Sequence, residues 1–207
     1  MIHQHTDTEM KRIAIFASGN GSNAENIIRY FRQQPLGAEV ALVVCNRAEA
    51  GVLHRAAALG VEAVVMPKAG INDEAAMTAL LESRGIDLIV LAGFLLMVPP
   101  FLIARYPDRI VNIHPSLLPK YGGKGMYGRH IHEAVVTAGE KETGITIHFV
   151  SDACDEGRII FQASVPVEPT DTPADVECKI HALEREHFPR VIAETFIDTH
   201  SQNAQNC

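Results

Sequence analysis

Polar residues in two distant segments have the types that acyl-transfer chemistry requires. Asn112 and His114 stand two apart, so in an extended segment their side chains point to the same face. An amide N–H can stabilise a developing oxyanion, and an imidazole can take or give a proton near neutral pH. Further along, Asp152 and Asp155 lie in a short acidic segment. Either carboxylate could hold the ring of His114 and favour its charged form, and the residues alone leave that choice open.

A glycine-rich turn, Ser18–Asn23 with the sequence SGNGSN, indicates a second kind of site. Glycines allow a backbone to approach a ligand closely, and a helix that starts behind such a turn offers free N–H groups to an anion. Ser22 and Asn23 can add donors or cap that helix. The turn lacks the GK[ST] of a P-loop, and Cys45-Asn46-Arg47 lacks the acid of a dinucleotide site. A single phosphate fits best, with an NADP enzyme, in which Arg47 would meet a ribose phosphate, as the alternative.

Along the chain, β-rich runs alternate with helical runs, which is typical of βαβ units and a parallel sheet. The expected strands are 12–17, 40–45, 61–66, 87–92 and 109–113, and the expected helices are 24–32, 51–59, 73–84 and 99–106. The fifth strand ends beside His114 and Pro115. Ligands bind at the carboxyl edge of open parallel sheets. This position favours a functional role for Asn112 and His114 over a purely structural one.

The pattern changes after residue 120. Tyr121–Gly128 has four glycines in eight residues and predicts a flexible loop. Two alternating runs, Gly144–Val150 and Arg158–Val167, flank Ser151–Gly157 and predict an antiparallel hairpin. Helices are expected at 131–138 and 172–195. The expected fold class is therefore α/β: a single doubly wound, mostly parallel sheet of about seven strands with an antiparallel hairpin in the C-terminal half. We expect one domain, 11–198, between flexible termini, 1–10 and 199–207.

Composition favours a globular protein that acts on small molecules. The 207 residues are 47% hydrophobic, which is enough for a substantial core. A formal net charge of -7 argues against nucleic acid as the main partner. We expect no membrane association, because no apolar run reaches the roughly 20 residues of a membrane helix. Met1–Met10 has no secretory signal pattern, and no two cysteines show CxxC spacing. These features favour a cytoplasmic location with reduced thiols.

A metal site is the main alternative for the histidines. His114 and His148 with an aspartate could bind zinc, and His130-Ile131-His132 has a suggestive spacing. However, helical residues two apart do not share a face, and the H-E-x-x-H pattern is missing. We therefore expect no metal. Cys154 is interpreted as a bystander in the chemistry, because the neighbouring Asp155 tends to raise the pKa of its thiol.

Four segments resemble the phosphoribosylglycinamide formyltransferase family of purine synthesis. They are Lys11–Asn26 with SGNGSN, Asp87–Val98 with LAGFLLMV, Val111–Tyr121 with VNIHPSLLPKY, and Gly144–Gly157 with GITIHFVSDACDEG. The resemblance implies a formyltransferase-like fold. It also implies transfer of the formyl group of 10-formyltetrahydrofolate to the primary amine of N1-(5-phosphoribosyl)glycinamide, without a metal, by a monomer or homodimer.

The resemblance also implies a role for particular residues. Asn112 corresponds to the oxyanion-stabilising amide, His114 to the catalytic imidazole, and Asp155, the second acid of a D-x-x-D tip, to the carboxylate that helps relay the proton. The implied substrate-binding residues are Asn20, Gly21, Ser22, Asn23, Pro115 and Glu184, of which Glu184 meets the glycinamide amine. The implied folate-binding residues are Leu95, Leu96, Met97, Val98, Ser151, Asp152 and Cys154. The sequence departs from the family at Asp73, where a basic residue is frequent near the folate tail.

Other functions share parts of this pattern. A formyltetrahydrofolate deformylase would use water in place of the amine, and normally has an extra N-terminal regulatory domain for which 207 residues leave no room. A methionyl-tRNA formyltransferase normally carries a basic RNA-binding domain, which an acidic chain does not suggest. A nucleotide-binding module without catalysis is the alternative of a different class.

Overall fold

The first half of the chain alternates strands and helices, as its sequence pattern predicts. In the computed structural model, which describes residues 10–197, five strands pair in parallel. The strands are β1 (Lys11–Ala17), β2 (Ala38–Cys45), β3 (Glu62–Val65), β4 (Leu88–Leu91) and β5 (Ile110–His114). The helices are α1 (Ser22–Gln33), α2 (Gly51–Ala58), α3 (Lys68–Ile71), α4 (Glu74–Ser83) and α5 (Pro100–Arg105). Helix α3 was not predicted, because four residues are too few to show a helical period.

The second half contributes an antiparallel hairpin and two helices. These elements are α6 (Arg129–Thr137), β6 (Glu142–Phe149), β7 (Ile159–Pro166) and α7 (Pro173–Phe196). Strand β5 pairs antiparallel with β6, and β6 pairs antiparallel with β7. Thr172 and Asp175 form a capping box at the start of α7, which explains why this start was recognisable from the sequence. The single sheet has the order β3-β2-β1-β4-β5-β6-β7, and the predicted fold class is confirmed.

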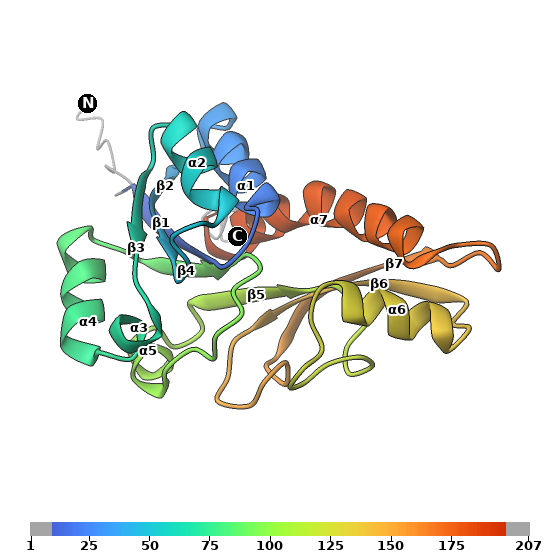
Figure 1. Cartoon of the computed structure of the whole chain (residues 1–207). Coiled ribbons are helices and arrows are strands. Elements are labelled where there is room, and N and C mark those ends of the chain that lie inside the picture. The colour runs from blue at the N-terminus through green and yellow to red at the C-terminus, as the bar shows by residue number, and fades with distance from the viewer. Residues whose placement is uncertain (1–9, 198–207) are drawn as a thin grey trace, which may run out of the picture.

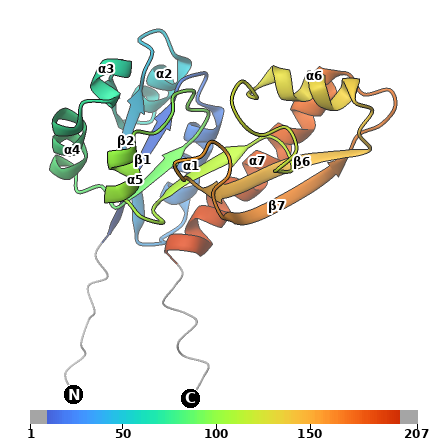
Figure 2. The ribbon, with the colours of Figure 1, turned by 90° about the horizontal axis from the view of Figure 1, so that it is seen from below.

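Helices cover both faces of the sheet (Figure 1). Side chains of β1 alternate between two cores: Ile13 and Ile15 face one side, and Phe16 faces the other. The first core contains residues of α1, α2 and α7, and the second contains residues of α3, α4 and α5. Seen from below, α6 lies at the β6–β7 end of the sheet, away from α3 and α4, and α7 runs from beside α6 towards α1 (Figure 2). Strands with both faces covered are nearly all apolar, and β4 is buried throughout.

The strand order places a ligand edge at the middle of the sheet. Strand β1 has β2 on one side and β4 on the other, so the direction of winding reverses between β1 and β4. In open α/β sheets this reversal opens a crevice at the carboxyl ends of the strands. No helix within residues 10–197 is both long and apolar enough to cross a membrane. The predicted flexible termini lie, apart from residue 10, outside the described residues.

Candidate active site

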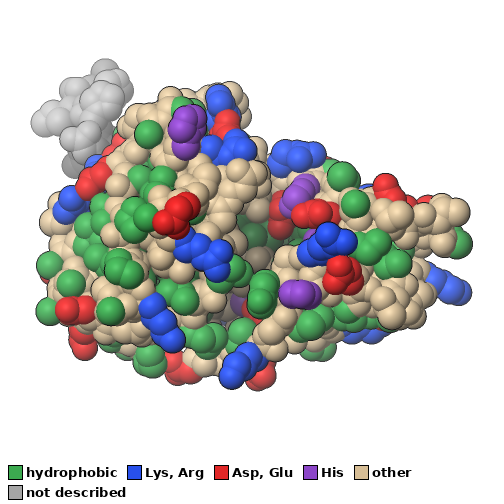
Figure 3. All heavy atoms as spheres, viewed as in Figure 1, with side chains coloured by type: hydrophobic (Ala, Val, Ile, Leu, Met, Phe, Trp, Pro, Cys, Tyr) green, Lys and Arg blue, Asp and Glu red, His purple; other side chains and the backbone are tan. Residues whose placement is uncertain are grey.

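One large cavity of about 1080 Å³ opens at the carboxyl ends of β1, β4 and β5. Segments far apart in the sequence line it: the glycine-rich turn Ser18–Asn23 after β1, Gly93–Met97 after β4, Asn112–Pro115 at the end of β5, and Cys154 and Asp155 from the loop between β6 and β7. The surface shows a hollow between the two lobes of the molecule (Figure 3). The side chains that the sequence singled out therefore share one compartment.

The glycine-rich turn is built from backbone. Gly21 has φ 82 and is the N-cap of α1, which has no side-chain cap. A Cβ added at Gly21 would meet Cβ of Val52 at 2.6 Å, so only glycine fits there. Arg55 donates from Nε to the carbonyl of Asn20 at 2.9 Å and also pairs with Glu25 of α1. The first N–H groups of α1 thus remain available to an anion in the cavity.

Asn23 connects this turn to helix α7 and does not cap its own helix. Its Nδ2 donates to Oε2 of Glu184 at 2.9 Å. Glu184 is 7% exposed, and its burial raises the pKa of the carboxyl, although the hydrogen bond from Asn23 acts in the opposite direction. Two of the six implied substrate-binding residues therefore touch each other, and all six line the cavity.

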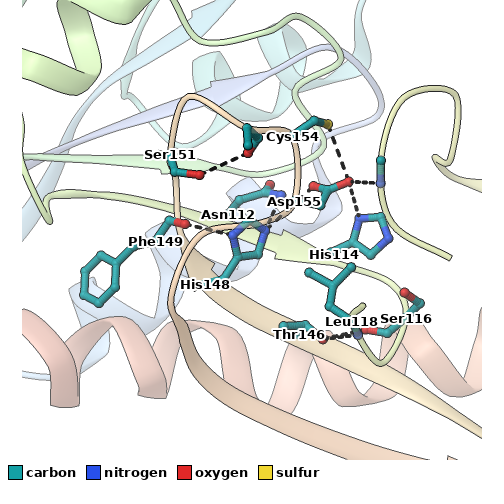
Figure 4. A network of polar contacts seen from close by, with 12 residues as sticks. Asn112, His114, Ser116, Leu118, Thr146, His148, Phe149, Ser151, Cys154 and Asp155 are labelled. Carbon is teal, nitrogen blue, oxygen red and sulfur yellow. Dashed lines mark hydrogen bonds and ion pairs between the residues drawn. The ribbon is translucent and has the colours of Figure 1, made fainter. Parts of the chain in front are cut away.

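The three predicted catalytic residues converge (Figure 4). Asn112 and His114 project from β5, and Asp155, with φ 57, lies on the loop between β6 and β7. Oδ2 of Asp155 is 3.6 Å from Nδ1 of His114 and accepts the N–H of Gly123 at 2.9 Å. Asp152 is exposed on the same loop. Of the two acids that the sequence left open, Asp155 is therefore the one beside the imidazole.

His148 lies beside the predicted catalytic residues, in a contact with Asn112 that the sequence did not reveal. It lies opposite Asn112 in the β5–β6 pairing, and Nδ2 of Asn112 contacts its Nε2 at 3.1 Å. Nδ1 of His148 is 2.9 Å from the carbonyl of Phe149, which can only accept, so Nδ1 carries the proton and Nε2 accepts from the amide. Burial lowers the pKa of His148, which favours this neutral form. The ring therefore fixes which way the Asn112 amide points.

The strand register was the signal that could have revealed this contact. Pairing of β5 with β6 at Asn112 and His148 follows once the hairpin is placed beside β5. The zinc alternative for His114 and His148 gains no support from the described residues, among which no three His, Cys, Asp or Glu side chains form a possible metal group. His130 is exposed on α6 whereas His132 is buried, as expected for helical residues two apart.

The implied folate-binding residues divide into two groups. Leu95, Leu96, Met97 and Cys154 line the cavity, and Leu95 and Met97 are 45% and 58% exposed. Apolar side chains exposed in a cavity are typical of a ligand site. Val98, in contrast, is buried in the core, and Ser151 and Asp152 lie on the β6–β7 loop outside the lining residues. Burial and the adjacent Asp155 raise the pKa of the Cys154 thiol, as predicted.

Basic residues also line the cavity. They include Arg47, which the sequence offered as a possible contact for a ribose phosphate, and Lys68, which it did not single out. Lys68 begins α3, the short helix that the sequence did not reveal. Asp73, which replaces the basic residue frequent in the family, caps α4 by accepting the N–H of Ala76 at 3.0 Å. Asp73 therefore has a structural role, and Lys68 supplies a cation nearby in the chain.

An amide, an imidazole and a carboxylate at the carboxyl edge of such a sheet are the groups that an enzyme of the formyl transferase family would need. The chain belongs to this family: the family model described as Formyl transferase matches residues 11–192. The phosphoribosylglycinamide formyltransferase of Bacillus subtilis is 37% identical over 189 residues, which cover 89% of this chain and 94% of that protein. The resemblance predicted from the sequence is thus confirmed.

Other relatives extend the comparison. The chloroplastic phosphoribosylglycinamide formyltransferase of Arabidopsis thaliana is 38% identical over 183 residues, which cover 86% of this chain and 62% of that protein. Among solved structures, glycinamide ribonucleotide transformylase 1 from Geobacillus kaustophilus matches with a TM-score of 0.80 and 39% identity. That match covers 90% of this chain and 98% of the other.

Proposed function

We propose that this protein transfers the formyl group of 10-formyltetrahydrofolate to the primary amine of N1-(5-phosphoribosyl)glycinamide. The observation that carries the proposal is the convergence of Asn112, His114 and Asp155 in a cavity that also contains the glycine-rich turn. Formyl transfer needs oxyanion stabilisation and proton transfer at one place. A phosphorylated amine also needs an anion site within reach of that place. The names of the relatives agree with this combination.

The reaction follows from these positions. The amine nitrogen of the substrate attacks the formyl carbon, a new C–N bond forms, and negative charge develops on the formyl oxygen. One N–H of Asn112 is directed to His148, which leaves the second N–H to stabilise that oxygen. The carbon–N10 bond then breaks, and the proton lost by the amine reaches N10. His114 and Asp155, 3.6 Å apart, carry that proton.

The two substrates take opposite parts of the cavity. The phosphate lies on the glycine-rich turn, where α1 presents its first N–H groups. Glu184 of α7 accepts a hydrogen bond from Asn23 of the turn, lines the same cavity and receives the polar part of the same substrate. The folate ring packs on Leu95, Leu96 and Met97 after β4. This arrangement brings the amine and the formyl carbon together in front of Asn112 and His114.

An assay with purified protein and both substrates tests the proposal. Formylated amine should appear only when the phosphorylated amine is present, and free tetrahydrofolate should form in equal amount. Release of formate without the amine would instead support a deformylase, and absence of any turnover would support a binding module. A chelator should leave the rate unchanged, because we propose no metal in the chemistry, and loss of activity on chelation would revive the zinc alternative.

A further inference from the structure

The contacts of His114 extend beyond the reacting groups. Its Nε2 lies 2.8 Å from the backbone carbonyl of Tyr121. A carbonyl oxygen can only accept a hydrogen bond, so Nε2 must carry a proton. In the neutral ring the free lone pair is then on Nδ1, the atom that faces Oδ2 of Asp155. The position of the Tyr121 carbonyl therefore decides which nitrogen of His114 exchanges a proton with Asp155.

The Tyr121 carbonyl is held in an uncommon conformation. Tyr121 has φ 56, a left-handed backbone that non-glycine residues seldom adopt. Such a conformation persists where the surrounding structure enforces it. One restraint is local: the hydroxyl of Ser116 donates to the carbonyl of Lys120 at 2.6 Å, one residue before Tyr121.

The second restraint comes from Glu140, on the turn that joins α6 to β6. Its carboxylate accepts from the hydroxyl of Tyr121 at 3.0 Å and from Nζ of Lys120 at 3.0 and 3.1 Å. The hydrogen bonds from these two partners lower the pKa of the Glu140 carboxyl, those from Lys120 most strongly. Glu140 thus holds both side chains of the dipeptide whose second carbonyl reaches His114.

We propose that Glu140 is a positioning residue for the formyl transfer: by anchoring Lys120 and Tyr121 it sets the tautomer of His114. Glu140 itself is not among the residues that line the cavity, so it acts through the Tyr121 carbonyl. This inference rests on the proposed function for its kinetic consequence. The position of the proton on His114 can be measured whether or not the protein is active.

The test compares Glu140→Ala with Glu142→Gln, a change at an exposed glutamate two residues away on β6. We expect Glu140→Ala to lower kcat about tenfold with little change in KM, part of the roughly 10²–10⁴ that a positioned acid–base group provides. Glu140→Gln, which keeps an acceptor for the Tyr121 hydroxyl, should recover most of this loss. Glu142→Gln should match the unchanged protein.

Long-range ¹H–¹⁵N spectra of the imidazole rings supply a readout that a merely structural role would not move. The His114 signal is identified by its loss in His114→Asn. We expect a protonated Nε2 in the unchanged protein and in Glu142→Gln, and a mixture of tautomers in Glu140→Ala. An unchanged tautomer in Glu140→Ala would overturn the inference, whatever happens to kcat, and so would a changed tautomer with unchanged kcat. If the chain formylates no amine, the proposed function fails, and the spectra still decide whether Glu140 sets the proton position.

Discussion

The glycine-rich turn and the catalytic residues lie at the same edge of the sheet but are built differently. The turn consists of backbone, which is held in place by close contacts within one part of the structure, formed by β1, α1 and α2. The catalytic group depends on side chains from β5 and from the β6–β7 loop, and on carbonyl and N–H groups of Tyr121 and Gly123. The proposed anion site is therefore made by one rigid stretch of backbone, whereas the proposed proton transfer depends on several segments that meet.

Among the variants considered, a change at Asp155 in the catalytic group should have the largest effect. Asp155→Asn should lower kcat about 10²–10³-fold, because an amide cannot take the proton from His114. The KM for the phosphorylated amine should change little, since the glycine-rich turn is unaltered. Glu156→Gln, at an exposed neighbour on the same loop, is the matched control and should retain full activity. Steady-state kinetics decide, and equal losses in the two variants would contradict the assignment.

A substitution in the glycine-rich turn should lower the stability of the folded protein. Gly21→Ala combines a positive φ of 82 with a contact of 2.6 Å to Val52. The two costs together should lower the free energy of unfolding by about 2–4 kcal/mol. Gly19→Ala is the control, because its added Cβ meets nothing within 4 Å, and its effect should stay within about 0.5 kcal/mol. Urea unfolding measures both, and similar stabilities would show that the turn is not held as described.

A smaller effect is expected where a side chain supports the turn. Arg55→Met removes the hydrogen bond to the Asn20 carbonyl and should raise the KM for the phosphorylated amine about threefold to tenfold at unchanged kcat, corresponding to the loss of about one hydrogen bond. Arg29→Met is the control, because Arg29 also pairs with Glu25 but is exposed on α1. A fall in kcat in place of a rise in KM would mean that the two regions are not separate.

The smallest effect concerns pH and His148. Burial lowers the pKa of His148 below the usual histidine value of about 6.5, so just below that pH the unfolded chain binds a proton that the folded chain does not. Stability should therefore fall as the pH decreases through this region. His148→Gln should flatten the dependence by at most about 1.4 kcal/mol per pH unit, the limit for one proton. Urea unfolding between pH 5 and 7 measures the slope, and identical slopes would rule out His148 as the source.

The same contrast explains what the sequence could predict. Alternating strands and helices, the hairpin and the turn at Ser18–Asn23 depend on local patterns, and each was placed within a few residues. The pairing of Asn112 with His148 and the contact of Tyr121 with His114 depend on register and on a left-handed residue. No local pattern in the sequence encodes either one. Val98 shows a further limit: the resemblance groups it with its neighbours at the folate, but the sequence does not reveal that its side chain is buried in the core while those of Leu95 and Met97 are exposed.

Ser18 connects the two loops that line opposite parts of the cavity. Its N–H donates to the carbonyl of Gly93 at 3.0 Å, and its hydroxyl accepts the N–H of Leu95 at 2.9 Å. A single buried residue therefore joins the loop after β1 to the loop after β4. These two hydrogen bonds therefore help to set the spacing between the proposed phosphate and folate positions. If the proposed function holds, a spacing fixed in this way reduces the reorganisation needed to bring the two reacting atoms together.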